Sequence, residues 1–492
     1  MIIVNPIVDI LLISGLAAIA TPLLGALVKV DKKFLGIPGA LAYLILILYV
    51  FQEDVWLQEY IWMPFQGLSG TEMAFDGFSK FFIIVFSLLA IPAYLHSIDY
   101  MERDRNLTLY YTLVSTMMFG LIGLSMAKDL FTFFVFWEAM AISSYVLVGF
   151  RYHLDEPVEA AVKYLVMSGV ASLLLLLGIS LVYGLVGSLQ IDVVILFVRQ
   201  VVDTPAIYPM LLATTLFLIG FGVKAAYFPF WTWLPDAHPA APSPVSALLS
   251  GIVIKAGIVG LARFALPFIT VLSDILYAPL LVITLATITI ANLMALMQSD
   301  IKRLLAYSSI ANIGFIMIGY VGSVYGAGLV GLAAAFSHVL SHALGKGLAF
   351  LSVGAILYVV HTRDIVNLEG FGRRYPGVAI ALMLALLSLG GMPPLPGFWS
   401  KWILILSAWD AGEYLLAFIG VFNSVLAIIY YLWLMQRIFF SEPRVEGDSE
   451  IPGYLLASLT ILMFIMLVIG VYPELMYEYA FEAAKALSSA FP

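Results

Sequence analysis

Five ionisable residues stand inside long apolar stretches of this sequence, where such side chains are rare. Lys224, Lys255, Lys346 and Lys401 lie well within apolar segments, and Glu138 lies in the middle of another. A charge at the centre of a bilayer costs roughly 2.5–3.5 kcal/mol on insertion scales, so five of them facing lipid would cost over ~10 kcal/mol. We therefore expect these groups to pair or to face water, and we take function as the default interpretation.

Two histidines extend this set. His338, His342 and Lys346 follow one another at intervals of four residues, so they share one face of a helix. Histidine titrates near neutral pH without help. Burial lowers the pKa of a lysine and a neighbouring carboxylate raises it, so a lysine that gains and loses a glutamate partner can carry a proton. The residues therefore predict a hydrated proton path across the protein.

A structural alternative stays open for every member of this set. The alternatives are an ion pair locking two helices for Glu138 and a structural role beside the helix break for Lys224. They are extension towards an interface for Lys255 and Lys401, and packing roles for His338, His342 and Lys346.

Charged residues near the ends of apolar segments suggest plainer roles. Lys163 lies near a helix end, where extension towards the interface and function are both open. Asp236 and His238 belong to a proline-rich stretch, which favours a shaped loop over a metal site. A solvated helix start with cytoplasmic charges is the interpretation for Asp300, Lys302 and Arg303.

Composition places all these residues in a membrane. The chain has 492 residues, of which 63% are hydrophobic and 11% charged, against about 25% charged in a typical soluble domain. This predicts an all-α polytopic membrane protein and excludes a secreted domain, a nucleic-acid binder and a disordered chain. The sequence has no Cys, which excludes disulfides and thiolate-held metal or iron–sulfur sites. Any redox chemistry would then belong to a partner.

Apolar runs and their interruptions predict about 14 transmembrane helices. The expected spans are 7–28, 36–51, 78–97, 107–127, 130–150, 160–186, 207–234, 244–263, 275–297, 302–321, 329–359, 377–408, 414–437 and 453–473. One set of loops is much richer in Lys and Arg than the other, so the positive-inside rule puts both termini outside a multi-pass plasma-membrane protein.

Spans seven and twelve are long and interrupted by proline. Broken backbone at membrane depth survives only where it is buried in protein or lines a wet cavity, and paired interrupted helices point to a transport pathway. Asp129 and Asp300 each follow an apolar span, five spans apart, and Pro229 and Pro396 lie beside the two interruptions. We therefore expect an inverted pair of five-helix repeats, with domains 1–106, 107–263, 275–437 and 438–492.

Several stretches are similar to a known family. They are Phe136-Trp-Glu138, Gly222-Val-Lys224 through His238 to Ser246, Asp300-Ile-Lys-Arg303, His338 through His342 to Lys346, and Pro394-x-Pro-Gly-Phe-Trp-Ser-Lys401. They resemble the antiporter-like, proton-translocating subunits of respiratory complex I, the D-type subunit of Mrp sodium/proton antiporters, and the matching subunits of membrane-bound hydrogenases.

The resemblance implies a path and partners. Glu138 would pair with Lys224, Lys255 would be the central lysine, the two histidines and Lys346 would continue the axis, and Lys401 would lead to the exit side. The chain itself would hold no cofactor. Iron–sulfur centres, and in hydrogenase-type assemblies nickel–iron centres, would belong to peripheral partner subunits, beside other membrane subunits. The chain stops soon after span fourteen, which favours a Mrp-D-like or hydrogenase-type subunit.

Two other classes remain. A stand-alone solute or cation transporter predicts a substrate-sized cavity and activity without partners. A non-conducting membrane anchor predicts that neutralising Glu138 and Lys401 leaves transport unchanged. The sequence leaves open what drives transport: a redox reaction of the hydrogenase or NADH dehydrogenase type, or sodium/proton exchange. It also leaves open whether the chain is a subunit of an oxidoreductase complex.

Overall fold

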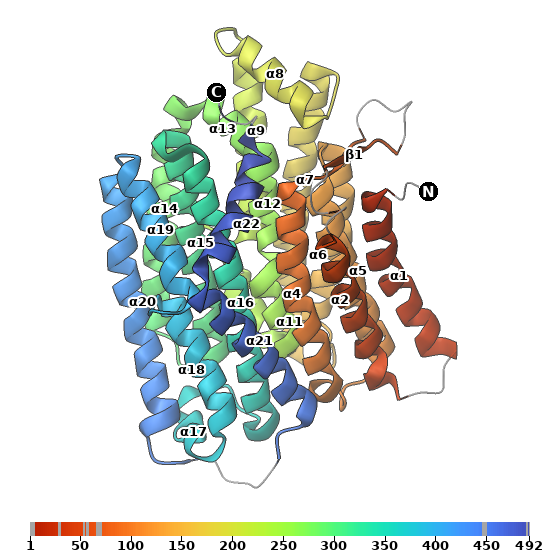
Figure 1. Ribbon diagram of the computed structural model, residues 1–492, viewed down its shortest axis with the longest axis vertical. Coiled ribbons are helices and arrows are strands. Elements are labelled where there is room, and N and C mark those ends of the chain that lie inside the picture. The colour runs from red at the N-terminus through yellow and green to blue at the C-terminus, as the bar shows by residue number, and fades with distance from the viewer. Residues whose placement is uncertain are drawn as a thin grey trace.

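The structure is a computed structural model, and it describes residues 5–27, 31–52, 55, 59–64, 71–444, 450–488 and 491. Helices run roughly side by side along the long axis of the molecule (Figure 1). Among the described residues, 12 helices are long and apolar enough to cross a membrane. The prediction of an all-α membrane protein is confirmed, apart from a small antiparallel pair, β1 (Tyr60–Trp62) and β2 (Met73–Phe75).

The first part of the chain leads up to one helix break. Its helices are α1 (Pro6–Leu27), α2 (Gly36–Val50), α4 (Gly77–Tyr100), α5 (Leu107–Met126), α6 (Leu130–Val148), α7 (Asp155–Val186), α8 (Ile191–Val201) and α9 (Ile207–Ala225). Helix α8, which no apolar run predicts, lies at the upper end of the molecule in Figure 1.

The break after α9 has its backbone groups satisfied by protein. Ala226 adopts a left-handed φ of 58°, and the Trp233 indole donates to the Val223 carbonyl at 2.7 Å. The Phe228 amide donates to the Thr287 hydroxyl at 3.0 Å. Because the protein supplies partners for groups that lipid cannot, non-helical backbone is stable here. The chain continues as α10 (Leu234–Ala240), α11 (Ser243–Leu248), α12 (Lys255–Gly260) and α13 (Leu266–Val271), with π-helical turns at Leu249–Val253 and Leu261–Ala265.

The remaining helices contain a second break. They are α14 (Ser273–Leu296), α15 (Ile301–Gly322), α16 (Gly328–Val360), α17 (Phe371–Arg374), α18 (Pro376–Gly390), α19 (Pro396–Asp410), α20 (Tyr414–Phe440), α21 (Gly453–Val471) and α22 (Pro473–Lys485). The break lies between α18 and α19, where Gly391 has a φ of 88° and the Gly397 amide donates to the Ser388 hydroxyl at 3.2 Å.

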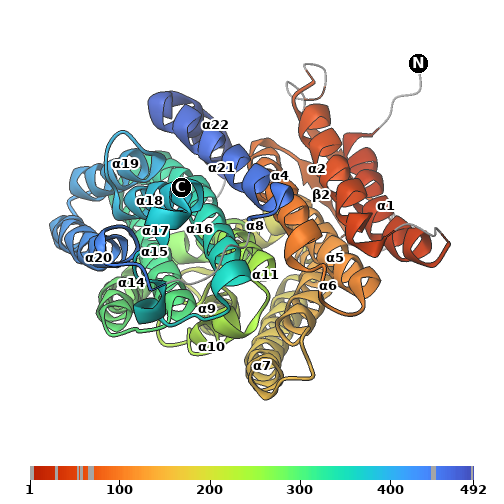
Figure 2. The ribbon, with the colours of Figure 1, turned by 90° about the horizontal axis from the view of Figure 1, so that it is seen from below.

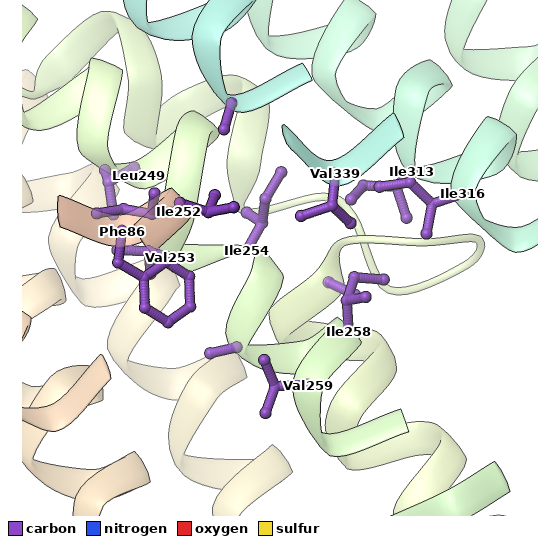
Figure 3. Packing of buried hydrophobic residues seen from close by; sticks show 14 of the residues in the cluster. Phe86, Leu249, Ile252, Val253, Ile254, Ile258, Val259, Ile313, Ile316 and Val339 are labelled. Atoms are coloured by element: carbon purple, nitrogen blue, oxygen red, sulfur yellow. The ribbon is translucent and has the colours of Figure 1, made fainter. Parts of the chain in front are cut away.

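Helix α16 is the central element. It packs against α4, α11, α15, α18, α19, α21 and α22, and it lies amid the bundle when the molecule is viewed from below (Figure 2). Every residue from Gly331 to Ile356 is buried. Figure 3 shows apolar side chains of the 249–259 segment, with Leu249 beside Phe86, Ile254 towards the middle and Ile258 near Val339. Any polar group in this layer is therefore shielded from lipid by apolar side chains.

Candidate functional site

Lys224 is the first buried cation, and hydroxyl groups hold it. It lies in the last turn of α9, just before the break, and only 1% of it is exposed. Its ammonium donates to the Tyr164 hydroxyl at 2.7 Å and to the Ser144 hydroxyl at 3.3 Å. Tyr164 in turn stacks on Trp233 with ring centroids 3.9 Å apart. The break in α9 thus brings the lysine against side chains of α6 and α7.

Glu138 does not form the expected ion pair with Lys224 in the described part of the structure. No nitrogen–oxygen contact within 4.0 Å joins them, and the buried Oε1 of Glu138 has no hydrogen-bond partner there. The two charges still lie within electrostatic range of each other. Ser144 and Tyr164 occupy the hydrogen-bonding positions around the ammonium, so the carboxylate acts on Lys224 through space in this conformation.

Lys255 is the central cation, and it meets α16 directly. It is fully buried at the start of α12, after a π-helical turn. Its ammonium donates to the Ser250 carbonyl at 2.7 Å and lies in hydrogen-bond contact with Nδ1 of His342. A direct hydrogen bond between a lysine and a histidine requires one of them to be neutral or to share its proton. The pair can therefore pass a proton between α12 and α16.

A second polar cluster joins α16 to α19. His338 contacts the Ser400 hydroxyl through Nδ1 at 2.9 Å and Asn312 Oδ1 through Nε2 at 3.1 Å. Its ring lies 6.3 Å from that of His342, with an angle of 25° between the planes. Lys401 follows Ser400 directly and donates to the Leu389 carbonyl at 2.8 Å. The two histidines therefore stand between Lys255 and Lys401.

Lys346 lies on the same face of α16, one turn beyond His342. Its ammonium donates to the Leu305 carbonyl at 2.9 Å and contacts the Ser308 hydroxyl. Both partners belong to α15. The side chain is fully buried, so an ammonium here depends wholly on these oxygens and on water for solvation.

One expectation about the helix start at Asp300 is wrong. The Asp300 carboxylate caps α15, accepting from the amides of Lys302 at 2.8 Å and Arg303 at 3.0 Å. Lys302, however, is not solvated: it is 2% exposed and donates to the Ala241 carbonyl at 2.6 Å. The first turn of α15 packs against α10, so the side chain enters the protein rather than the water.

The prediction of a loop around Asp236 is wrong, because this proline-rich stretch is helical. The Asp236 carboxylate makes ion pairs near the surface. Asp236 in α10 contacts Lys163 at 3.0 Å and Arg303 at 3.6 Å. His238 is buried, and neither ring nitrogen has a hydrogen-bond partner among the described residues. Within those residues, no group of three or more His, Asp or Glu side chains is placed to hold a metal ion.

The polar partners of the buried lysines and of His338 were missed from the sequence. Ser144, Tyr164, Ser308, Asn312 and Ser400 carry no signal of their own, because hydroxyl and amide residues are ordinary in transmembrane helices. The buried ion pair between Arg263 and Asp76, at 2.8 Å, was missed as well. Sequence spacing of three or four residues identifies only partners that lie on the same helix as the charged residue. These partners lie on other helices, so spacing does not reveal them.

Outside the spans, the turn between α5 and α6 carries two side chains whose pKa values differ from their ordinary ones. Burial raises the pKa of Asp129, although hydrogen bonds from the Glu72, Phe131 and Thr132 amides oppose the rise. Burial lowers the pKa of Lys128, but a hydrogen bond and the charge of Asp192 outweigh it and leave the pKa raised. This turn is therefore a buried cap with a paired cation beside it.

Comparison with known proteins decides the family. Residues 127–427, more than half of the chain, match the family described as NADH:quinone oxidoreductase/Mrp antiporter, TM. The chain belongs to this family. It is an antiporter-like, proton-translocating membrane subunit, and the predicted resemblance is confirmed.

Curated members of the NADH:quinone oxidoreductase/Mrp antiporter family resemble the chain over most of its length. F(420)H(2) dehydrogenase subunit N of Methanosarcina mazei is 32% identical over 427 residues, covering 84% of this chain and 85% of that protein. NADH-quinone oxidoreductase subunit N of Desulfitobacterium hafniense is 33% identical over 431 residues, with coverages of 84% and 85%. These two relatives carry the name of subunit N rather than a Mrp or hydrogenase name.

Solved structures of three assemblies contain the same fold. A chain of the archaeal membrane-bound sulfane sulfur reductase matches with a TM-score of 0.88 at 27% identity, covering 99% of this chain and 98% of that one. A chain of the Mrp complex from Dietzia sp. DQ12-45-1b matches with a TM-score of 0.83 at 25% identity, covering 99% of this chain and 98% of that one. A chain of Thermus thermophilus respiratory complex I matches with a TM-score of 0.76 at 26% identity, covering 95% of this chain and 98% of that one.

Proposed function

We propose that protons cross this chain along the partly buried Glu138 and the buried groups Lys224, Lys255, His338, His342, Lys346 and Lys401. The observation that carries this proposal is the row of four lysines, each at most 3% exposed, with two buried histidines between them. Burying four cations without carboxylate ion pairs is costly. A role that requires their protons to come and go accounts for that cost, whereas a purely structural role does not.

In this proposal Lys224 is the gating station of the axis, and Glu138 controls it. The carboxylate favours the ammonium from a distance, and the two hydroxyls hold the ammonium in place. Lys255 and His342 exchange a proton through their direct contact. His338 leads to Ser400, and Lys401 completes the axis beside the second break. Lys346 faces the same axis from one turn further along α16.

We further propose fourteen crossings, with helices seven and twelve broken. The 12 candidate spans treat Ile301–Val360 as one stretch, yet Gly326 has a φ of 146° inside it and α15 and α16 pack against each other. Helices α18 and α19 have 15 residues each. Each is too short to cross alone, and together they supply one more crossing.

A repeated hydrogen-bond pattern supports the inverted repeats 107–263 and 275–437, flanked by domains 1–106 and 438–492. In the first, the Leu130 amide donates to the Leu189 carbonyl and the Ile191 amide to the Lys128 carbonyl. In the second, Ile301 donates to Arg363 and Ile365 to Ser299 in the same pattern. Asp129 and Asp300 cap the following helix in both cases.

Sidedness and assembly follow as part of the proposal. An even number of crossings places both termini on one side, and the loop charges make that side the outside of the plasma membrane. Helix α1 begins and α22 ends towards the same end of the molecule (Figure 1). The relatives named as dehydrogenase and oxidoreductase subunits support membership of a multisubunit complex whose other subunits hold iron–sulfur or nickel–iron centres. The Mrp match supports sodium/proton exchange as the other possible driver.

The test replaces Lys224 by Ala in the intact complex, reconstituted in vesicles with its own driving reaction. We expect proton movement to fall to the level of vesicles without the complex, with all subunits still assembled. The matched control is Lys163→Ala, which removes a lysine that is 49% exposed and should leave proton movement unchanged. Wild-type proton movement in assembled Lys224→Ala would contradict the proposal.

A further inference from the structure

A cavity of about 490 Å³ opens between the ends of several helices on the side that carries most of the basic loops. Its lining comes from the start of α7, from α10, from the start of α15 and from the end of α16. It includes Arg151, Leu154, Ala240, Lys302, Thr362 and Arg363. The volume is large enough for several water molecules, since each occupies about 30 Å³ in the liquid.

Lys302 is the most buried ionisable residue in the lining of this cavity. Its ammonium donates to the carbonyl of Ala241 at 2.6 Å and reaches that of Pro239 at 3.5 Å. These two carbonyls flank the end of α10. The main chain thus holds one buried cation in the lining of a cavity that also carries more exposed, ion-paired charges such as Arg151, which contacts Asp104 at 2.8 Å.

His238 lies in α10, whose end lines this cavity, and the proposed axis does not use it. It is fully buried, and both ring nitrogens lack partners among the described residues. An unpartnered buried polar group is costly. Its ring stacks on Phe350 with centroids 4.7 Å apart, and Phe350 lies one helical turn beyond Lys346 on α16. His238 is also within electrostatic range of Lys302, Lys346 and Lys255.

We infer that this cavity is the cytoplasmic proton intake of the chain, with Lys302 and His238 passing protons from cavity water to Lys346. The inference rests on the proposed function and names the intake that it leaves open. The Lys302 ammonium gives a proton to one imidazole nitrogen of neutral His238 through bridging water. The other nitrogen releases a proton towards the neutral amine of Lys346, and Lys302 regains its proton from the cavity.

A neighbouring cavity of about 590 Å³ provides a contrast. Its charged lining includes Lys163, Asp236 and Arg303, which pair with one another at the surface. All three have side chains that are 28% exposed or more, whereas Lys302 is 2% exposed. Only the first cavity therefore ends on a buried cation, and the second supplies matched control positions.

The first test uses substitutions that keep the structural contacts and remove the proton chemistry. Lys302→Arg keeps a cation for the two carbonyls, but arginine does not release its proton in proteins. His238→Phe keeps the aromatic stack on Phe350. In the intact complex, reconstituted with its driver, we expect each variant to lower proton movement by about 10²-fold or more with assembly unchanged. Wild-type rates in both assembled variants would overturn the inference.

The second test exploits the absence of cysteine from the chain. Thr362→Cys places a thiol in the cavity lining, and Gln298→Cys places one in the neighbouring cavity. Both are treated from the cytoplasmic side with a bulky, membrane-impermeant thiol reagent. We expect labelling to block proton movement in Thr362→Cys only.

The outcomes distinguish failure of the intake from failure of the proposed function. If labelled Thr362→Cys moves protons normally while Lys224→Ala does not, the intake lies elsewhere and the proposed function stands. Block in labelled Gln298→Cys alone also overturns the inference, in favour of the neighbouring cavity. If Lys224→Ala moves protons at the wild-type rate, the proposed function and the inference fall together.

Discussion

The lysines beside the two helix breaks, Lys224 and Lys401, are solvated in different ways. Lys224 donates to two side-chain hydroxyls contributed by α6 and α7, and the charge of Glu138 acts on it from a distance. Lys401 donates instead to the Leu389 carbonyl at the end of α18 and lies 4.3 Å from the centre of the Phe315 ring. No carboxylate lies within 4.0 Å of either ammonium among the described residues.

This difference suggests that the two halves of the chain, one around each helix break, have different roles in proton movement. The carbonyl end of a helix carries a fixed partial negative charge, so the partner of Lys401 cannot change its protonation. A carboxylate can be neutralised, approached or withdrawn, so the partner of Lys224 can be switched. We therefore expect control of proton movement to lie in the first half and passive relay in the second.

Among the changes that compare the two breaks, the largest expected effect comes from removing that switchable charge. Glu138→Gln keeps the size of the side chain and eliminates the carboxylate. Lys224 then loses its electrostatic partner, and proton movement should fall by about 10²-fold, the effect of about 2.7 kcal/mol on the barrier. The measurement is proton movement per turnover of the driver in reconstituted vesicles.

Glu138→Asp serves as the control, because it keeps the charge and should retain part of the activity. Equal rates for the Gln variant and the wild type would show that the two breaks are equivalent, and the difference in roles between the two halves would be refuted.

A smaller effect is expected from the hydroxyl that holds Lys224. Tyr164→Phe keeps the stack on Trp233 but removes a hydrogen bond to an ionised group, worth about 1.5–3 kcal/mol. We expect a decrease of about tenfold, and a weaker one for Ser400→Ala, which removes a contact of His338 in the second half. The rates of the two variants, measured side by side, check the order. A larger loss in Ser400→Ala would reverse the comparison.

The smallest effects concern stability at the two helix caps. Asp129 is fully buried and also accepts from the Glu72 amide at 2.6 Å, whereas the Asp300 side chain is 25% exposed. Asp129→Ala should cost about 2 kcal/mol and Asp300→Ala about 1 kcal/mol, within the range for N-caps. Thermal unfolding in detergent measures both.

The pH dependence of folding stability gives a further test of the cap at Asp129. Because the folded-state pKa of Asp129 is raised, the folded protein holds this proton more tightly than the unfolded chain. Its contribution to stability should therefore fall as pH rises from the ordinary aspartate pKa of 3.8 through the raised folded pKa. Asp129→Asn should abolish this slope while keeping the cap, and an unchanged slope would contradict the assignment.

The spans and breaks were predictable because their signals are local. Apolar runs of about 20 residues mark crossings, and Pro229 and Pro396 lie where helical hydrogen bonding must fail. The buried lysines were found for the same reason, since a charge inside an apolar run stands out.

The arrangement around the lysines was not predictable, because it depends on contacts between helices distant in sequence. Tyr164 and Ser144 become partners of Lys224 only when α6, α7 and α9 pack together. Lys302 lies at a helix start with charged neighbours, which is typical of a solvated end, yet α10 covers it. Helix α8 has 11 residues, too few to produce a spanning run.

The most direct test of the central claim is to interrupt the axis at its middle. Lys255→Met removes the only described ammonium in contact with His342 and replaces it with an apolar side chain of similar length in an apolar layer. Proton movement by the intact, reconstituted complex should fall to the background of empty vesicles while all subunits remain assembled. Proton movement at the wild-type rate in the assembled variant would show that protons do not cross this chain along the buried axis.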